Sequence, residues 1–278
     1  DATTAAFNQT IKDKAGNSTA CSYTVGVYRD TVNPTCGTPI GQGSTSSWIN
    51  SASTNKTRTI TAGCSDATSG CGALPNQSYS TDATTAAFNQ TIKDKAGNSK
   101  ACSYTVGVYR DITAPTTPTT MNFVFGDWSV YGGSWTNQAV YAGRISSSPA
   151  PTGSTDNTSG VNRYQISSNG STWYNYSYNS GDSMYAMSTQ GTHTRYFRAV
   201  DNAGNVSGNL TKSAYIDKTA PPIPTSAVKY DSSSGTQRSN TDTSWTNRTL
   251  WWGSFSSADT GGSGTASYQY YTSCPSSI

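Results

Sequence analysis

Aspartates in recurring short motifs are the residues of this chain whose types and spacing could do chemistry. Three kinds of motif hold them: an Asp that closes a Tyr-rich segment, an Asp followed by a Ser-Gly pair, and the first residue of an Asp-x-Ala-Gly-Asn sequence. The six candidates are Asp30, Asp66, Asp94, Asp111, Asp156 and Asp201. Carboxylates are hard oxygen ligands of the kind that Ca²⁺ prefers. Aspartate in a turn also commonly accepts a hydrogen bond from its own backbone, so a calcium role and a turn role are both open.

The cysteines bear on the redox compartment of the protein. Four of the six fall within residues 34–113: Cys36, Cys64, Cys71 and Cys102. An even number in a segment the size of a small domain favours disulfides and an oxidising location, and four cysteines allow three connectivities. Zinc is the competing interpretation, but the chain has no Cys-x-x-Cys pair and a single histidine, His193. We therefore expect disulfides, with Cys21 and Cys274 lacking partners in this sequence.

Aromatic side chains form a second candidate binding feature. The chain has 18 Tyr and 7 Trp. Five aromatic residues crowd one segment: Trp173, Tyr174, Tyr176, Tyr178 and Tyr185. Such rings could stack on a glycan or contact a host-surface protein. Trp48, Trp135 and Trp245 recur instead in a Ser-Trp-x-Asn motif, and this regular recurrence predicts core residues.

Catalytic and charge signals are weak. The chain has no Glu, one His and no Ser in a nucleophile-elbow motif, which excludes Glu acid/base pairs, HExxH metal sites and Ser-His-Asp triads. We therefore predict that the segment is not an enzyme. The net charge of +3 is not clustered, so no nucleic-acid partner is expected. No run of eighteen apolar residues is present, so we expect no membrane insertion in this segment.

Internal repetition indicates the elements that carry these residues. Residues 1–30 recur at 82–111 with one change, Thr19 to Lys100. Such a copy predicts a tandem array of small domains. The expected domains are the back half of one at 1–33, whole ones at 34–113 and 114–219, and the front part of another at 220–278. Because residues 1–33 would lack a front half, we expect them to be frayed or to dock as a bare hairpin on the neighbouring domain.

Short alternating runs rich in Val, Tyr and Thr, broken by Gly, Asn, Asp or Pro, predict an all-β fold. Strands are expected at residues 57–61, 104–109, 161–166 and 194–200. The hydrophobic fraction of 33% and the mean hydropathy of −0.57, with only 12% charged residues, are typical of small extracellular β-domains. Proline at the junctions restricts the backbone and predicts an extended array.

These motifs resemble the bacterial immunoglobulin-like repeats of cell-surface proteins and adhesins. The matching features are the Asp-x-Ala-Gly-Asn turn, the Asp-x-Thr-Ala-Pro junction at residues 111–115 and 217–221, and the Asp followed by Ser-Gly. The resemblance implies β-sandwiches of about seven strands with Greek-key connections. The last two strands of the whole domain would be residues 86–93 and 101–110.

The resemblance also implies which residues meet. In such a sandwich the first and last strands start at the same end, which favours Cys36 with Cys102 and leaves Cys64 with Cys71; Cys64 with Cys102 is the alternative. The Ser-Gly loop and the Ala-Gly-Asn turn would lie at the end that receives the preceding domain. The aspartates would then gather at two junctions, Asp30 with Asp66 and Asp94, and Asp111 with Asp156 and Asp201.

The function that follows is mechanical: a stalk segment of a bacterial surface protein, presenting a distal module away from the cell. Its partners would be neighbouring immunoglobulin-like repeats of the same chain. Two alternatives stay open, a module that binds a glycan or host-surface protein through residues 173–185, and an accessory region of a secreted polysaccharide-degrading enzyme. Apart from Ca²⁺ at the junctions, we expect no cofactor.

Overall fold

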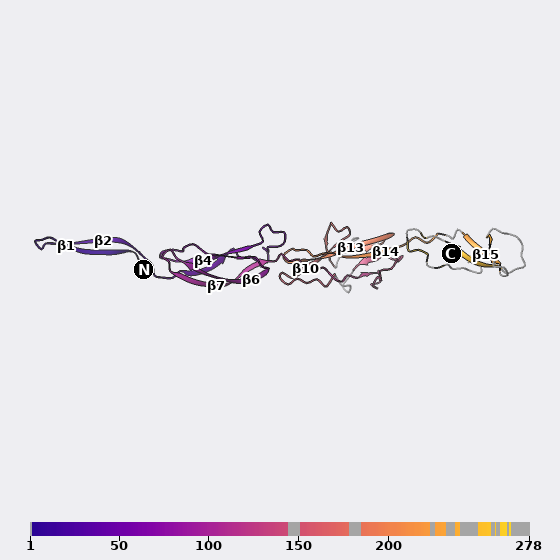
Figure 1. The fold of residues 1–278 in the computed structure, drawn as a ribbon, viewed down its shortest axis with the longest axis horizontal. Coiled ribbons are helices and arrows are strands. Elements are labelled where there is room, and N and C mark those ends of the chain that lie inside the picture. The colour runs from indigo at the N-terminus through magenta and orange to yellow at the C-terminus, as the bar shows by residue number, and fades with distance from the viewer. Residues whose placement is uncertain are drawn as a thin grey trace. The chain divides into compact units, whose positions relative to one another are not determined.

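The computed structural model is all-β, with no helix in the part of the chain that it describes (Figure 1). That part comprises residues 2–143, 151–177, 185–222, 226–231, 237–239, 250–256, 259, 262–265 and 267. The strands form several small antiparallel sheets, as the alternating sequence runs predict. Since helices are absent from these residues, none of them offers a helix that could cross a membrane.

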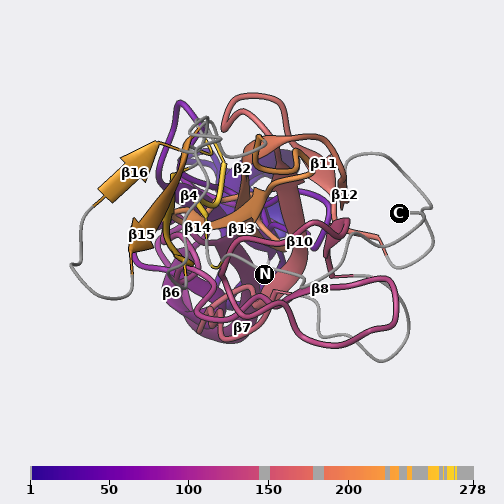
Figure 2. The ribbon, with the colours of Figure 1, turned by 90° about the vertical axis from the view of Figure 1, so that its right-hand side faces the viewer.

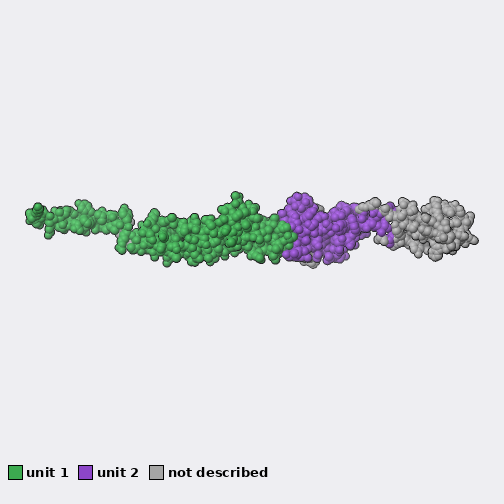
Figure 3. Space-filling model, in the orientation of Figure 1, with its two compact units in different colours: residues 1–117, 154–163, 199–208 green, residues 118–153, 164–198, 209–278 purple. Residues whose placement is uncertain are grey.

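The chain divides into two compact units, which have different colours in Figure 3. The first consists of residues 1–117, 154–163 and 199–208, and the second of residues 118–153, 164–198 and 209–278. The strands, in chain order, are β1 Ala2–Lys12, β2 Ser18–Arg29, β3 Thr35–Ile40, β4 Arg58–Ser65, β5 Asn76–Tyr79, β6 Ala83–Lys93, β7 Ser99–Arg110, β8 Phe123–Val124, β9 Val140–Ala142, β10 Val161–Ser167, β11 Tyr174–Asn175, β12 Ala186–Met187, β13 Gly191–Asp201, β14 Leu210–Ile216, β15 Ser226–Asp231, β16 Gln237–Ser239 and β17 Leu250–Ser256.

The core of the first unit is shared by two groups of strands. Strands β3-β4-β5 form one sheet and β6-β7 form another. Their inward side chains make one buried cluster: Ile60, Ala62, Tyr79, Phe88, Ile92, Cys102, Val106 and Val108. Burial follows the two-residue period of a strand, because Phe88 and Ile92 of β6 are buried whereas Asn89 and Thr91 are exposed. The apolar alternation of the sequence therefore places this core.

The duplicated sequence folds into two matching hairpins, β1-β2 and β6-β7. Phe7 pairs with Tyr23 in the first, as Phe88 pairs with Tyr104 in the second. Gly97 has φ +100° in the turn of the second hairpin, a left-handed conformation that favours glycine. Only the second hairpin packs into the core cluster of the unit. The first is a two-stranded sheet by itself.

The second unit builds its core from short strands. Its sheets have the orders β11-β10-β13-β14, β12-β9-β8 and β16-β15-β17, and β15 lies beside β16 in Figure 2. The buried cluster comprises Met121, Phe123, Tyr131, Val140, Ala142, Ile166, Tyr185, Met187, Phe197, Ala214 and Ile216. The four predicted strands are confirmed, since β4, β7, β10 and β13 occupy their positions.

The two described tryptophans of the Ser-Trp-x-Asn motif, Trp48 and Trp135, lie outside the buried core clusters. Trp135 is 38% exposed, Trp48 is half-buried, and Trp245 lies outside the described residues. Trp48 meets Tyr109 edge-on at 5.3 Å between ring centroids, and Trp135 meets Tyr215 at 5.6 Å. The core prediction is wrong for Trp135, because the recurrence reflects a repeated contact with a tyrosine near the end of a strand.

Candidate functional site

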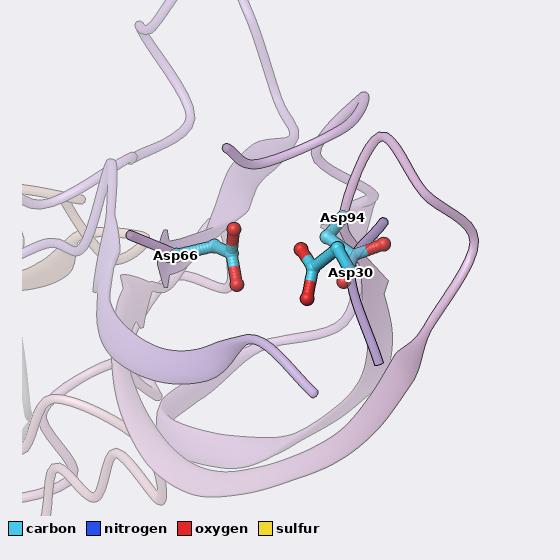
Figure 4. A group of neighbouring side chains, drawn as sticks. All are labelled: Asp30, Asp66 and Asp94. Carbon is cyan, nitrogen blue, oxygen red and sulfur yellow. The ribbon is translucent and has the colours of Figure 1, made fainter. Parts of the chain in front are cut away.

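The first aspartate cluster joins three segments of the first unit. Asp30 follows β2, Asp66 follows β4 and Asp94 follows β6, and their side chains converge in Figure 4. One oxygen from each carboxylate lies within 4.8 Å of the other two. Asp94 is buried, while Asp30 and Asp66 are half-buried. The structure thus brings together three of the residues that the sequence predicted.

Two carboxylates of this cluster, those of Asp66 and Asp94, accept hydrogen bonds from residues of their own loops. Asp66 Oδ1 accepts hydrogen bonds from the backbone N–H groups of Ser69 at 3.0 Å and Gly70 at 2.7 Å. Asp94 accepts from the backbone and the side-chain amide of Asn98, both at 2.8 Å. These are the turn roles that aspartate commonly takes.

The third carboxylate ties the end of the N-terminal hairpin to a distant loop. Asp30 Oδ1 accepts from the Val32 N–H at 3.0 Å, and Asp30 Oδ2 accepts from the Ser69 N–H at 3.1 Å. Asn98 Nδ2 donates to the Asp30 carbonyl oxygen at 3.2 Å. Hydrogen bonds from Ser69, with a further one from the Val32 N–H, lower the pKa of Asp30. The outgoing strand is therefore held by two loops that lie 39 and 68 residues further along the chain.

The second predicted cluster repeats this geometry in Asp111, Asp156 and Asp201, which also belong to the first unit. Asp111 Oδ2 accepts from the Ser159 N–H at 3.1 Å, and Asp156 Oδ1 accepts from the Ser159 and Gly160 N–H groups. Here Asp111 and Asp201 are fully buried. The same three-loop arrangement thus forms in a deeper and drier setting.

In each cluster, an Asp that follows a strand accepts a hydrogen bond from the N–H group of a distant Ser; we call this arrangement the aspartate tie. A third copy of it lies within the second unit. Asp217 Oδ2 accepts from the Ser263 N–H at 2.7 Å, and Asp217 Oδ1 accepts from the Thr219 N–H at 3.1 Å. Asp259 Oδ2 accepts from the Gly264 N–H at 2.9 Å. Asp217 and Asp259 correspond to Asp111 and Asp156. The junction motif at residues 217–221 is visible in the sequence, but it does not by itself place Asp217 in a site.

The asparagines of the Ala-Gly-Asn turns are functional residues that sequence reasoning missed. Asn205 is buried, and its Nδ2 donates to the carbonyl oxygens of Asp111 at 2.9 Å and Thr113 at 3.2 Å and to Asp201 Oδ2 at 2.8 Å. The signal was available, since Asn closes each of the three turn motifs. The motif alone predicts only a local turn role for that Asn.

Asn205→Ala is expected to destabilise the second cluster by about 2 to 3 kcal/mol, because it removes the amide that donates to the carbonyl and carboxylate oxygens of the buried Asp111 and Asp201. Amide hydrogen exchange of residues 199–206 measures the loss. Asn17→Ala is the matched control: Asn17 is exposed and its side chain donates to Asp13 of its own turn, so a change within about 0.5 kcal/mol is expected. Equal losses at the two positions would contradict the tying role.

Asp111 and Asp217, the strand-end aspartates of the second and third ties, have pKa values that are shifted in opposite directions. Burial raises the pKa of Asp111 above 3.8, and the nearby Asp156 and Asp201 carboxylates raise it further. Hydrogen bonds from the Ser263 backbone and then the Gln190 side chain lower the pKa of Asp217.

These opposite shifts predict opposite contributions to stability. Asp111 favours folding below pH 3.8, and this contribution is lost as the pH rises through its raised folded pKa. Asp217 stabilises the fold above pH 3.8, and this contribution is lost as the pH falls through its lowered pKa. A carboxyl ¹³C NMR titration in EDTA should place the Asp111 midpoint above 3.8 and the Asp217 midpoint below it. The reverse order would contradict the assignment.

The donor set of both clusters fits Ca²⁺ in kind. Three carboxylates with oxygens within 4.8 Å of one another are compatible with an ion that takes six to eight oxygens at 2.3–2.6 Å. The hydrogen bonds described above satisfy the turn role without an ion. Melting temperatures in Ca²⁺ and in EDTA separate the two roles: the turn role alone predicts equal values, whereas bound Ca²⁺ predicts a higher value that EDTA removes.

Two disulfides lie beside the first cluster. Cys36 is bonded to Cys102, and Cys64 is bonded to Cys71, the pairing favoured by the immunoglobulin-like resemblance. The Cys64–Cys71 bridge encloses the loop that carries Asp66 and Ser69. Cys21 is a free thiol, and Cys274 lies outside the described residues. Disulfides of this kind are typical of an oxidising setting.

The aromatic residues of segment 173–185 do not share one surface. Tyr185 is 6% exposed and belongs to the core, and Tyr176 packs against that core with its ring 5.4 Å from the Tyr185 ring. Tyr174 is 51% exposed, and the Arg198 guanidinium lies 4.0 Å from the centre of the Trp173 ring. Tyr178 lies outside the described residues. Of the four described residues, Tyr176 and Tyr185 therefore belong to the core or pack against it, which leaves Trp173 and Tyr174 as the candidates for a stacking role.

Comparison with known proteins does not identify a family for this chain: no family model matches it, and no curated protein matches it.

Proposed function

We propose that this chain is a structural spacer of an extracellular bacterial surface protein. In this proposal, immunoglobulin-like sandwiches follow one another at residues 34–113 and 114–219, with partial domains at 1–33 and 220–278, and hold a distal module away from the cell. The two disulfides support an oxidising location. The spacer role needs no catalytic residue, which agrees with the single His and the lack of Glu.

The observation that carries this proposal is the aspartate tie, which recurs three times. Asp30, Asp111 and Asp217 each follow a strand, and each carboxylate accepts from a Ser N–H that lies 39, 48 or 46 residues further along the chain. A spacer needs a connection of fixed geometry between each repeat and the next. A tie that fixes each outgoing strand to the following Ser-Gly loop is suited to that task, because hydrogen bonds on both carboxylate oxygens restrict the connecting peptide.

Small-angle X-ray scattering of the chain tests the spacer role. A compact protein of 278 residues would have a radius of gyration of about 19 Å, and we expect a value well above it. Alanine at all three tying aspartates should lower the value and broaden the distribution of distances. Asp127→Ala is the control, because Asp127 accepts hydrogen bonds from Ser129 in its own turn. A compact wild-type chain would rule out the spacer.

Recognition of a glycan or host-surface protein is the second candidate, and it has less support. It relies on Tyr174 and Trp173, since Tyr176 and Tyr185 serve the core. A glycan array with the chain tests it: binding that Tyr174→Ala abolishes would favour this function over the spacer. The third alternative, an accessory region of a polysaccharide-degrading enzyme, has no residue in the described chain that favours it.

A further inference from the structure

The asparagine of the first Ser-Trp-x-Asn motif, Asn50, contacts a turn that lies far along the chain. Asn50 Nδ2 donates a hydrogen bond to the Ala203 carbonyl oxygen at 2.8 Å, across 153 residues of sequence. The N–H group of the next residue, Ser51, donates to Asn205 Oδ1 at 2.7 Å. Both acceptors belong to the Asp-x-Ala-Gly-Asn turn of residues 201–205, and all four residues lie within the first unit. Two donors of one loop therefore meet two acceptors of this turn.

We call residues 49–56 the Asn50 loop, and its first residue fixes it to the end of β7. The Ile49 N–H group donates to the Tyr109 carbonyl at 2.9 Å, and the Ile49 carbonyl accepts from the Asp111 N–H group at 2.8 Å. The Trp48 ring also meets the Tyr109 ring. Since Asp111 belongs to the second aspartate cluster, the Asn50 loop has a fixed place beside that cluster.

Hydrogen bonds within the Asn50 loop orient the Asn50 side chain. Asn50 Oδ1 accepts from the Ala52 N–H group and from the Ser53 hydroxyl, both at 3.1 Å. Because the amide oxygen is used inside the loop, the amide nitrogen is left to donate to the turn. Lys56 Nζ donates to the carbonyl oxygens of Asn50 and Ser51. The loop is therefore preorganised, which lowers the entropic cost of its contact with the turn.

The turn has the conformation and the burial that this contact needs. Gly204 has φ +95°, a left-handed conformation that favours glycine. A Cβ atom at Gly204 would also lie 3.3 Å from Asn50 Nδ2, a tight contact. Ala203 is 7% exposed and Asn205 is 1% exposed. Loss of a donor at such a buried site would leave an acceptor without water to replace it, which is costly.

The residues that the contact uses are those that the three turn motifs share. Ala, Gly and Asn occur in all of them, whereas x is Lys14, Lys95 or Asn202. Asn202 is exposed. The hydrogen bonds of the Asn50 loop go to the Ala and the Asn of the turn, and its amide nitrogen lies against the Gly. The chemistry of the loop therefore selects an Ala-Gly-Asn turn and does not depend on x.

The second Ser-Trp-x-Asn motif is anchored in the same way within the second unit. The Thr136 N–H group donates to the Tyr215 carbonyl at 3.0 Å, and the Thr136 carbonyl accepts from the Asp217 N–H group at 2.8 Å. Trp135 meets the Tyr215 ring, as Trp48 meets Tyr109. The motif thus brings its Asn next to a strand-end aspartate in both units.

We propose that the Asn50 loop is an interaction surface by which one repeat recognises the Asp-x-Ala-Gly-Asn turn of the repeat that follows, and that Asn50 is its specificity-determining residue. The aspartate tie holds the outgoing strand, whereas the Asn50 loop holds the following turn through donors of its own. This inference deepens the spacer function and rests on it, because it names the partner of the loop.

Amide hydrogen exchange of the full chain carrying Asn50→Asp tests the proposal. The substitution keeps an oxygen that can accept inside the loop, and it replaces the donor to the Ala203 carbonyl with a second oxygen, which leaves that carbonyl unpaired. The amides of Gly204 and Asn205 bond to Asp201 within the turn. We expect both of these amides to exchange at least tenfold faster than in the wild-type chain.

Two controls separate recognition of the turn from damage to the loop. The amides of Ser53 and Asp111 donate to carbonyls of the Asn50 loop itself, and they should exchange as in the wild-type chain. Asn137→Asp is the matched variant, because Asn137 holds the same position of its motif and is exposed. It should leave the exchange of Gly204 and Asn205 unchanged.

A third variant tests the selectivity of the surface. Asn202→Lys gives the turn the sequence of residues 94–98. In this background, Asn50→Asp should again speed the exchange of Gly204 and Asn205 at least tenfold, because x takes no part in the contact. Loss of that effect would mean that the loop also reads x, which would contradict the proposed selectivity.

Three results would overturn the proposal. The first is unchanged exchange of the turn amides in the Asn50→Asp chain, and with an extended chain in scattering this result would leave the spacer intact. The second is faster exchange of both the turn and the Ser53 and Asp111 amides, because Asn50 would then only shape its own loop. The third is faster turn exchange in a compact chain, which would reject the spacer and reduce the contact to one within a single domain.

Discussion

Replacing Cys36 and Cys102 with alanine is expected to destabilise the fold of residues 34–111 by about 4 kcal/mol. The bridge joins residues 66 apart in sequence, so it removes a large loop entropy from the unfolded chain. Cys102 is also buried in the core of the first unit. Native-state hydrogen exchange of β4 and β7 amides measures the loss, and β13 and β14 amides provide an internal reference.

The Cys64–Cys71 bridge is the matched comparison, because it joins residues only 7 apart. The same loop-entropy relation predicts about 2 kcal/mol for the double alanine variant. We expect the tie between Asp30 and Ser69 to survive this change. The equivalent loop around Asp156 makes the same hydrogen bonds to Ser159 and Gly160 with no cysteine in it.

The two double variants therefore test the origin of the stabilisation. A larger cost at Cys64 and Cys71 than at Cys36 and Cys102 would contradict the loop-entropy account. It would show instead that the aspartate loop needs its bridge to hold the three carboxylates together. Equal and small losses of stability in the two double variants would mean that the apolar cluster supplies most of the stability.

Local patterns predicted much of this fold, because their causes are local. Alternation predicted part of β7, and the Asp-x-Ala-Gly-Asn turn requires a glycine in the left-handed region at Gly97. The clustering of Asp30 with Asp66 and Asp94 came from the resemblance to a known type of sandwich. The second cluster came from the same resemblance, and the structure brings together the three carboxylates of each.

Burial was less predictable, because it depends on which segments pack together. Tyr176 and Tyr185 lie close in sequence to the exposed Tyr174, yet they pack in a core built by strands far along the chain. Trp135 shows the reverse case, because its motif predicts a core residue and yet it is 38% exposed. Its ring contacts Tyr215, which lies at the edge of that core. The duplicated hairpins are the clearest example. Their sequences are almost identical, but only β6-β7 has a covering sheet, and so only β6-β7 has a buried apolar face.

Phe88→Ala should destabilise the first unit by about 3 to 5 kcal/mol, the usual cost of truncating a buried phenylalanine. Phe88 is completely buried among side chains from both sheets of the unit. The truncation removes apolar contact and leaves a cavity that the disulfide-bonded strands can only partly close. Hydrogen exchange of β4 and β7 amides again provides the measurement, because these strands line the cluster.

Phe7→Ala is a control in which the neighbouring sequence is unchanged. Phe7 has the same strand position and cross-strand tyrosine as Phe88, but it is 48% exposed and no sheet covers it. We expect a change within about 0.5 kcal/mol, so the difference between the variants isolates the covering sheet from intrinsic strand propensity. A similar loss at both positions would contradict this account, because it would mean that the truncation costs stability without the covering sheet.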